Sequence, residues 1–295
     1  MTWTRKRIII AVSVVYIAGL VILGIAFGKS PKANFDIQSE FKLTPWVKAG
    51  PLEINRGVVY LFLSILATLA SVAYVSRKMQ QRPNRVQTAV ETMYSLMRDN
   101  ISRGNLDPRM AARWFPFLGT VFLFLWWCNI IGYIPLPTNS EETINIFGVA
   151  VPSFALYAAT ANVSVAFILS LVVFILFNAE GFRKWGFRGY FKHLMPSGVG
   201  KLLVLVAPLE IISTFMRLVS LTIRLWANIL AGHMIILFMS GGMAVILGIT
   251  AIGWLTLPLG VAVFMFEVGL IASLQAFIFA TLSAIYLAGA VEGGH

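Results

Sequence analysis

PLEIISTFMRLVSLTIRLWANILAGHMI, residues 208–235, is the stretch on which the fold of this chain depends. It is mostly Leu, Ile, Val, Ala and Met, the composition of a segment in lipid or in a protein core. A charged side chain deep in a bilayer costs about 3 kcal/mol, so such residues are rare there and are usually functional. This stretch nevertheless contains two arginines and three further strongly polar residues: Glu210, Arg217, Arg224, Asn228 and His233.

The two sides of this stretch, read as a helix, carry different chemistry. Arg217 and Arg224 are seven residues apart, about two helical turns, so they share one face, which Asn228 joins. Arginine is not deprotonated in proteins, and Arg224 is therefore a permanent positive charge. His233 falls on the opposite side of the helix and offers an imidazole that titrates near neutrality.

The composition is that of an integral membrane protein. The 295 residues are 58% hydrophobic and 12% charged, whereas soluble domains average about 25% charged. The net charge of +11 would suggest nucleic acid in a soluble protein, but here the basic residues cluster at helix ends, which indicates membrane topology and lipid headgroups instead. The single cysteine, Cys128, gives no disulfide or zinc spacing, and no nucleotide-binding motif is present, so we expect no cofactor and no metal site.

Four apolar runs have the length of conventional transmembrane spans. They are Ile8–Phe27, Gly57–Val75, Phe115–Ile134 and Phe154–Phe177. The first follows a basic start, as a signal peptide also does, but it is about 20 residues long, and we expect a retained helix. Between the first two spans, Gly28–Arg56 is polar and proline-containing, and we expect irregular structure there.

Residues 86–101 are amphipathic. Val86, Val90, Met93, Met97 and Ile101 recur at intervals of three and four, which forms one apolar stripe on a helix. We expect this helix to lie on the membrane surface, and the alternative is a soluble linker helix.

Lysine and arginine collect in alternating segments, as the positive-inside rule expects. The N-terminus has three, residues 77–113 have eight and residues 183–201 have five, whereas residues 135–153 have none. Residues 28–56 have five, diluted by three acidic residues. We therefore expect the N-terminus and both basic loops to be cytoplasmic, and the C-terminus as well.

Residues 202–290 are almost unbroken apolar sequence, interrupted only at Ser240-Gly241-Gly242. A helix of about 40 residues is about 60 Å long, against a hydrocarbon core of about 30 Å. No polar turn divides either half. The sequence therefore predicts an all-α polytopic membrane protein with four conventional spans, a surface amphipathic helix and a C-terminal hairpin of two long, steeply tilted helices.

Several blocks of the chain resemble a known family. RLWANILAGHMI (224–235) and FEVGLIASLQAFIFATLSAIYL (266–287) resemble the a subunit of rotary F-type ATP synthases, of the bacterial type. QTAVETMYSLMRDNI, PFLGTVFLFLWWCNIIGYIP and TANVSVAFILSLVVF are similar to earlier blocks, in the family's order. The resemblance covers roughly Arg77 to Glu292, and the RLWANILAGH block is its most specific part.

The resemblance implies roles for the polar residues of the last two helices. Arg224 would face the proton-carrying carboxylate of a ring of c subunits, and Gln275 would orient its guanidinium through a hydrogen bond. The alternatives are a structural ion pair of Arg224 with Glu210 or Glu267 and, for Gln275, a polar contact between helices. His233 and Glu267 would line the half channel on the side away from the cytoplasm. Further positions on the proton path would be Asn228, Glu210, Arg217, Ser220 and Asn162.

Three positions leave alternatives open. Glu267 lies eight residues before Gln275, one more than the resemblance implies, so either a local bulge restores the register or the role of Glu267 is shifted. Thr160 stands where some relatives carry an acid, so a relay there would use hydroxyls and water. Arg217 either lines a channel or extends to the cytoplasmic headgroups. Asn129 is assigned to helix packing.

The function that the resemblance implies is proton translocation, by a non-catalytic stator subunit in the plasma membrane of a bacterium. Its partners would be the c ring, the peripheral-stalk b subunits, the other ATP synthase subunits and the lipid bilayer, without nucleic acid. We expect one membrane domain, made of residues 1–56, 57–201 and 202–295. The alternative is a self-contained ion-coupled transporter, although no internal repeat supports it. An intramembrane enzyme is discounted because the apolar core offers a single histidine and no aspartate.

Overall fold

The computed structural model describes residues 43, 45–49, 52–78, 85–146, 149–194, 203–239 and 250–291. The chain divides into two compact units. Unit 1 comprises residues 1–42 and 231–270, and unit 2 comprises residues 43–230 and 271–295. The predicted first span, Ile8–Phe27, lies outside the described residues.

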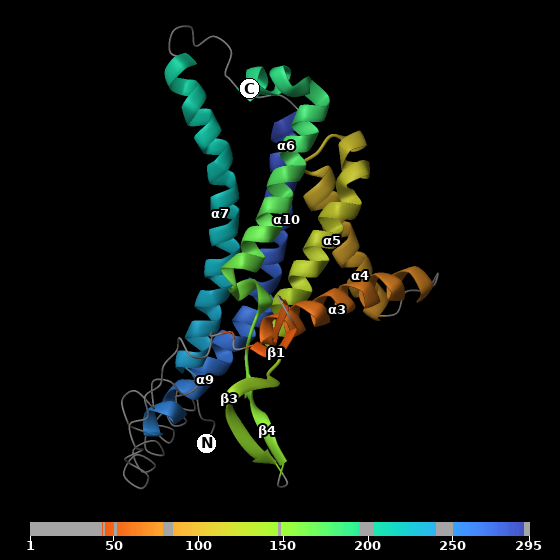
Figure 1. The fold of residues 1–295 in the computed structure, drawn as a ribbon. Coiled ribbons are helices and arrows are strands. Elements are labelled where there is room, and N and C mark those ends of the chain that lie inside the picture. The colour runs from red at the N-terminus through yellow and green to blue at the C-terminus, as the bar shows by residue number, and fades with distance from the viewer. Residues whose placement is uncertain are drawn as a thin grey trace, which may run out of the picture. The chain divides into compact units, whose positions relative to one another are not determined.

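Five helices among the described residues are long and apolar enough to cross a membrane. They cover Arg56–Val75, Pro108–Gly132, Val163–Tyr190, Val206–Leu237 and Thr256–Val291. Figure 1 shows them as long coiled ribbons along the chain. This confirms the all-α polytopic class predicted from the sequence.

One β-hairpin directly precedes the helix α3 (Arg56–Lys78), and a second lies between α5 (Pro108–Gly132) and α6 (Val163–Leu194). β1 (Pro45–Ala49) pairs with β2 (Leu52–Asn55), and β3 (Leu136–Ile146) pairs with β4 (Val149–Ala155), both antiparallel. The expectation of irregular structure throughout Gly28–Arg56 was therefore wrong for the part that contains β1 and β2. Proline is tolerated in the edge strands of a sheet, and both strands of a two-stranded hairpin are edge strands.

The amphipathic segment forms α4 (Arg85–Ser95) followed directly by a π-helix, η1 (Leu96–Arg103). Its predicted apolar stripe is real, but Met97 and Ile101 are buried against other helices of unit 2. The C-terminal carbonyls of η1 are covered by Asn105, whose Nδ2 donates to the backbone oxygens of Asn100 at 3.1 Å and Ile101 at 2.8 Å. At least part of the stripe therefore packs on protein.

The helix α5 (Pro108–Gly132) begins seven residues before the predicted start at Phe115. Asp107 is its N-cap, and its side chain accepts from the Arg109 backbone N–H. Proline at the first helical position and an N-cap aspartate form a strong start. α3 (Arg56–Lys78) packs along α5, and their polar contact joins Trp127 Nε1 to Ser71 Oγ at 2.9 Å.

The helix α6 (Val163–Leu194) differs from the prediction at both ends. The predicted span began at Phe154, but residues 149–155 belong to β4, because an apolar run of this length suits a strand as well as a helix. The helix also continues into the predicted basic loop and breaks at Gly186, whose φ is +68° and ψ is 167°. Only glycine adopts this conformation without strain.

The C-terminal third contains the two long helices predicted from its apolar sequence. The first is α7 (Leu203–Leu237). The second is a continuous run of α9 (Thr250–Phe266), the π-helix η5 (Glu267–Ile271) and α10 (Ala272–Val291). Their apolar stretches have 32 and 36 residues, or about 50 Å each at 1.5 Å per residue. The steep tilt in the membrane stays a prediction.

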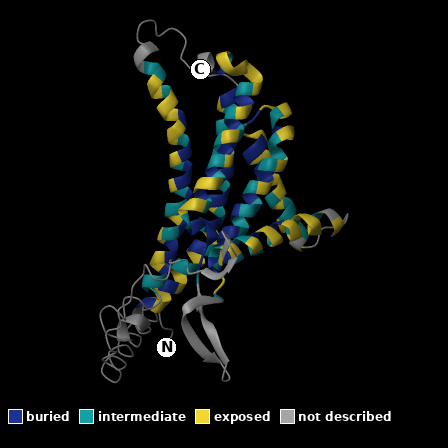
Figure 2. Ribbon diagram, viewed as in Figure 1, coloured by how far each residue is buried: buried dark blue, intermediate teal, exposed yellow. Residues whose placement is uncertain are grey.

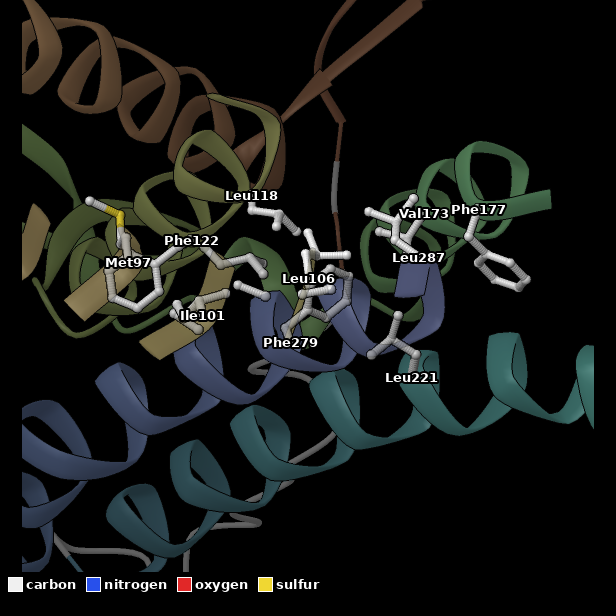
Figure 3. Close-up of a cluster of buried hydrophobic side chains, with 14 of the residues drawn as sticks. Met97, Ile101, Leu106, Leu118, Phe122, Val173, Phe177, Leu221, Phe279 and Leu287 are labelled. Atoms are coloured by element: carbon white, nitrogen blue, oxygen red, sulfur yellow. The ribbon is translucent and has the colours of Figure 1, made fainter. Parts of the chain in front are cut away.

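The core of unit 2 is formed by η1, α5, α6, α7 and α10. Figure 3 shows it as a cluster of aliphatic and aromatic side chains, in which Leu118 and Phe122 of α5 lie near Ile101 and Phe279, and Leu221 near Leu287. The buried residues form stripes on α5 and α10, whereas α3 and α7 keep many exposed positions (Figure 2). Small residues on α10, Ala276, Ala280 and Ala284, are fully buried and permit close helix packing.

Candidate functional site

Arg224 lies on α7 in unit 2, with its side chain partly exposed. Its Nη2 donates to the Ser220 Oγ one turn earlier, at a long distance of 3.4 Å. Within the described residues of unit 2, no carboxylate pairs with Arg224. The ion pairs of this unit include Arg103–Asp99, Arg113–Glu180 and Arg183–Glu180. A structural pairing of Arg224 with Glu210 is therefore not observed.

Asn228 connects α7 to α10. Its Nδ2 donates to the Gln275 Oε1 at 2.9 Å, and Gln275 is almost fully buried. The observed partner of Gln275 is therefore Asn228, and its expected hydrogen bond with Arg224 stays a prediction. Asn228 is one turn beyond Arg224 on the same face, and its amide complements the amide of Gln275.

Arg217 also connects α7 to α10. Its guanidinium carbon lies 5.5 Å from the centre of the Tyr286 ring, a cation–π distance. Asn228 and Arg217 are eleven residues apart, and so are Gln275 and Tyr286, in the opposite direction. Eleven residues are about three helical turns, so both contacts use one face of each helix. These two contacts show that α7 and α10 run antiparallel, as a hairpin requires.

Asn162 has a local structural role. It precedes α6 instead of lying within a span as expected, and its Oδ1 accepts from the Ser164 backbone N–H at 2.8 Å, as an N-cap does. Burial raises the pKa of the nearby Tyr157 phenol, while a hydrogen bond with Asn162 and the charge of Arg56 lower it.

Glu210 is partly buried on α7, and its backbone oxygen accepts from Thr214 Oγ1 at 3.0 Å.

A chain of buried polar groups joins three elements of unit 2. Thr160 Oγ1, in the 3₁₀ turn Ala159–Ala161, donates to Asn129 Oδ1 at 2.8 Å. Asn129 Nδ2 donates in turn to the backbone oxygen of Ala272, the first residue of α10, at 3.1 Å. Both side chains are completely buried. The sequence places both residues in apolar surroundings but contains no indication that they meet.

The extra residue between Glu267 and Gln275 is taken up by the π-helix η5, which begins at Glu267 itself. In a regular α-helix a spacing of eight residues turns a side chain by about 80°. A π-turn absorbs one residue, which leaves the rotation of seven residues, about 20° short of two full turns. The local bulge proposed from the sequence is therefore present. By residue count, it returns Glu267 to the face of Gln275.

In unit 1, the buried carboxyl group of Glu267 lies against Gly232. A Cβ atom on residue 232 would stand 2.6 Å from Glu267 Cδ and 2.9 Å from Oε1, so the Glu267 carboxyl group would have to move to make room for it. The adjacent His233 is completely buried. The close approach of Gly232 to the Glu267 carboxyl group was not foreseen from the sequence.

The amino-acid sequence was compared with known protein families and with curated proteins. The model of the ATP synthase A chain family matches residues 58–288. The chain is a member of this family. It is similar to ATP synthase subunit a of Pelagibacter ubique, at 33% identity over 90% of this chain and 99% of the relative. It is also similar to ATP synthase subunit a 1 of Hahella chejuensis, at 34% identity over 84% of this chain and 88% of the relative.

Membership of the ATP synthase A chain family defines the coarse function. The chain is a multi-pass membrane protein of the membrane sector, CF(0), of an ATP synthase complex, and it serves hydrogen ion transport in ATP synthesis. The self-contained transporter has no support from the family match. Among the residues that the structure describes, no three His, Cys, Asp or Glu side chains come together as a metal site would need.

Proposed function

We propose that this chain is the stator half of a rotary proton channel, with two half channels separated by Arg224. The observation that carries the proposal is the environment of Arg224: a permanent cation on an apolar helix, with one long hydrogen bond to Ser220 and no carboxylate partner among the described residues of unit 2. A charged side chain in the apolar part of a membrane is costly, and an anion from another subunit would offset this cost. A proton-carrying carboxylate on a ring of c subunits would supply it.

The chemistry of Arg224 follows from its fixed charge. A cation within about 4–6 Å of a carboxyl group lowers its pKa by roughly 1–3 units, which favours release of the proton as the carboxyl arrives. Because arginine keeps its own proton, it neither accepts nor relays one, and it blocks a direct path between the two half channels. The Asn228–Gln275 hydrogen bond fixes the helix pair one turn away.

The two half channels would use residues on either side of Arg224 along the chain. Buried His233 and Glu267 are suited to pass protons on the side away from the cytoplasm, since imidazole titrates near neutrality. Glu210, Ser220 and Arg217 would serve the cytoplasmic side. This assignment requires cytoplasmic N- and C-termini, in agreement with the distribution of Lys and Arg.

The surface around Arg224 suits an apolar partner. Met216, Val219 and Ile223 on α7 are each more than two-fifths exposed. We assign this surface to the c ring, and place the peripheral-stalk b subunits elsewhere on the chain. The subunit would be non-catalytic, and ATP chemistry would take place in other subunits.

ATP-driven proton pumping by vesicles that contain the whole complex tests this proposal. Arg224→Ala should abolish acidification, while ATP hydrolysis by the detached peripheral sector continues. Arg109→Ala removes an arginine at the exposed start of α5 and should pump as wild type. Near-normal pumping by Arg224→Ala would overturn the proposal. Measuring ATP-driven Na⁺ uptake by the same vesicles, instead of acidification, separates H⁺ from Na⁺ coupling.

A further inference from the structure

We propose that Asn129 is a positioning residue for the proton path: it fixes the start of α10 behind the π-turn and so aims Gln275 at Asn228. The inference rests on the proposed function, because it concerns the orientation of a residue assigned to that path. Asn129 touches neither Arg224 nor Gln275 in the described contacts, and it acts through the backbone of Ala272.

The position of the contact carries the inference. The π-helix η5 ends at Ile271, and the carbonyl oxygen that accepts from Asn129 belongs to the next residue, Ala272. Gln275 follows three residues later, about one turn further along α10. A helix that absorbs an extra residue can do so at different positions, and if the bulge moved beyond Gln275, residues 272–275 would turn by about 100° relative to the rest of α10. A contact directly after the π-turn selects one of these registers.

The amide of Asn129 is held in one orientation. Thr160 donates to its Oδ1, so the Nδ2 group is the part that faces the Ala272 carbonyl. Because both side chains are fully buried, reversal of the amide would leave buried groups without hydrogen bonds, which is costly. The Thr160 hydroxyl is thereby engaged in a structural hydrogen bond at the position where a proton relay was considered.

A second contact from α5 supports the first. Trp126 Nε1 donates to Ser273 Oγ at 3.0 Å, and Trp126 is three residues before Asn129, on the same side of α5. α5 therefore contacts α10 at two consecutive residues, Ala272 and Ser273. The Asn228–Gln275 hydrogen bond lies on the turn that these contacts orient.

The test is a cross-linking register experiment in the assembled complex, with Cys128→Ser as background. A cysteine at 228 is paired in turn with a cysteine at 274, 275 or 276, and a short bifunctional thiol reagent is applied to membranes. With Asn129 present, the 228–275 pair should react fastest. Asn129→Leu and Thr160→Val should slow it about tenfold, as the loss of a buried hydrogen bond predicts, and a neighbouring pair should become fastest.

Thr160→Ser is the matched control, because it keeps the hydroxyl, and it should preserve the wild-type order of reaction. If 228–275 remains the fastest pair in Asn129→Leu and Thr160→Val, Asn129 has a packing role alone and the inference is wrong, whatever the amount of complex formed. A shifted order together with normal pumping by Arg224→Ala would support the positioning role of Asn129 and overturn the proposed function.

Discussion

The carboxyl group of Glu267 occupies the space that a side chain at residue 232 would need, so any residue larger than glycine at 232 would displace this carboxyl group. The contact brings a residue of α7 and the first residue of the π-helix η5 together inside unit 1. The position of this acid therefore depends on two features, a glycine on one helix and a π-turn on the other.

Gly232→Ala should impair proton pumping with little loss of stability, because the added methyl group has only to displace the flexible end of the Glu267 side chain. The displaced atoms are those of the proposed proton carrier. Gly260→Ala is the control, because a Cβ there would meet Met239 at an ordinary 3.5 Å. Combining Gly232→Ala with Glu267→Asp should recover part of the pumping, since the shorter side chain withdraws the carboxyl group.

The π-turn predicts that one deletion is tolerated where another is not. Removing Gly269 should convert η5 into regular α-helix and leave the rotation between Glu267 and Gln275 unchanged, so pumping should persist. Removing Leu274 should rotate Gln275 by about 100° relative to Ala272 and abolish pumping. Equal loss of ATP-driven acidification in both deletions, at equal amounts of assembled complex, would contradict the assigned role of the bulge.

Gly186→Ala should lower the stability of unit 2 by about 1–3 kcal/mol, because φ +68° with ψ 167° is a region that other residues adopt only under strain. Space is not the limitation, since no atom lies within 4 Å of the added Cβ. Thermal unfolding of the solubilised complex measures the effect. Gly189→Ala, three residues further on, meets only Trp185 Cβ at 3.4 Å and should be close to wild type.

The ion pair between Arg113 and Glu180 should show modest coupling. The two groups are 2.9 Å apart, but the Arg113 side chain is 49% exposed, so a double-mutant cycle should give about 0.5–1 kcal/mol. Arg183 approaches the same carboxylate only to 3.9 Å and is 68% exposed, and its cycle with Glu180 should give less. Larger coupling to Arg183 than to Arg113 would contradict the observed geometry.

Much of the helical architecture was predictable because, in a membrane protein, the length of an apolar run strongly indicates a spanning helix. Gly57–Val75 was predicted and α3 covers it, and both long C-terminal helices followed from apolar sequence without a polar turn. The start of α6 was not predictable, because the apolar residues of β4 read equally well as helix. The early start of α5 was indicated by Asp107 and Pro108 but obscured by the arginines that come next.

The candidate site was predictable in its residues but not in its contacts. The resemblance implied one extra residue between Glu267 and Gln275, and the π-helix η5 lies in this interval. Which side chains pair depends on helix rotation, which sequence spacing alone leaves open. For that reason the partner of Gln275 proved to be Asn228, and the buried contacts of Asn129 were not foreseen.

The passive proton permeability of vesicles from which the peripheral sector has been removed tests the role of Arg224 most directly. Wild type, Arg224→Ala and Arg224→Lys are compared at equal amounts of assembled membrane sector, after an imposed pH step. If Arg224 separates two half channels, the alanine variant should leak protons faster than wild type and have lost ATP-driven pumping. A membrane with Arg224→Ala that stays as tight as wild type and still pumps would show that Arg224 is not the barrier between two half channels.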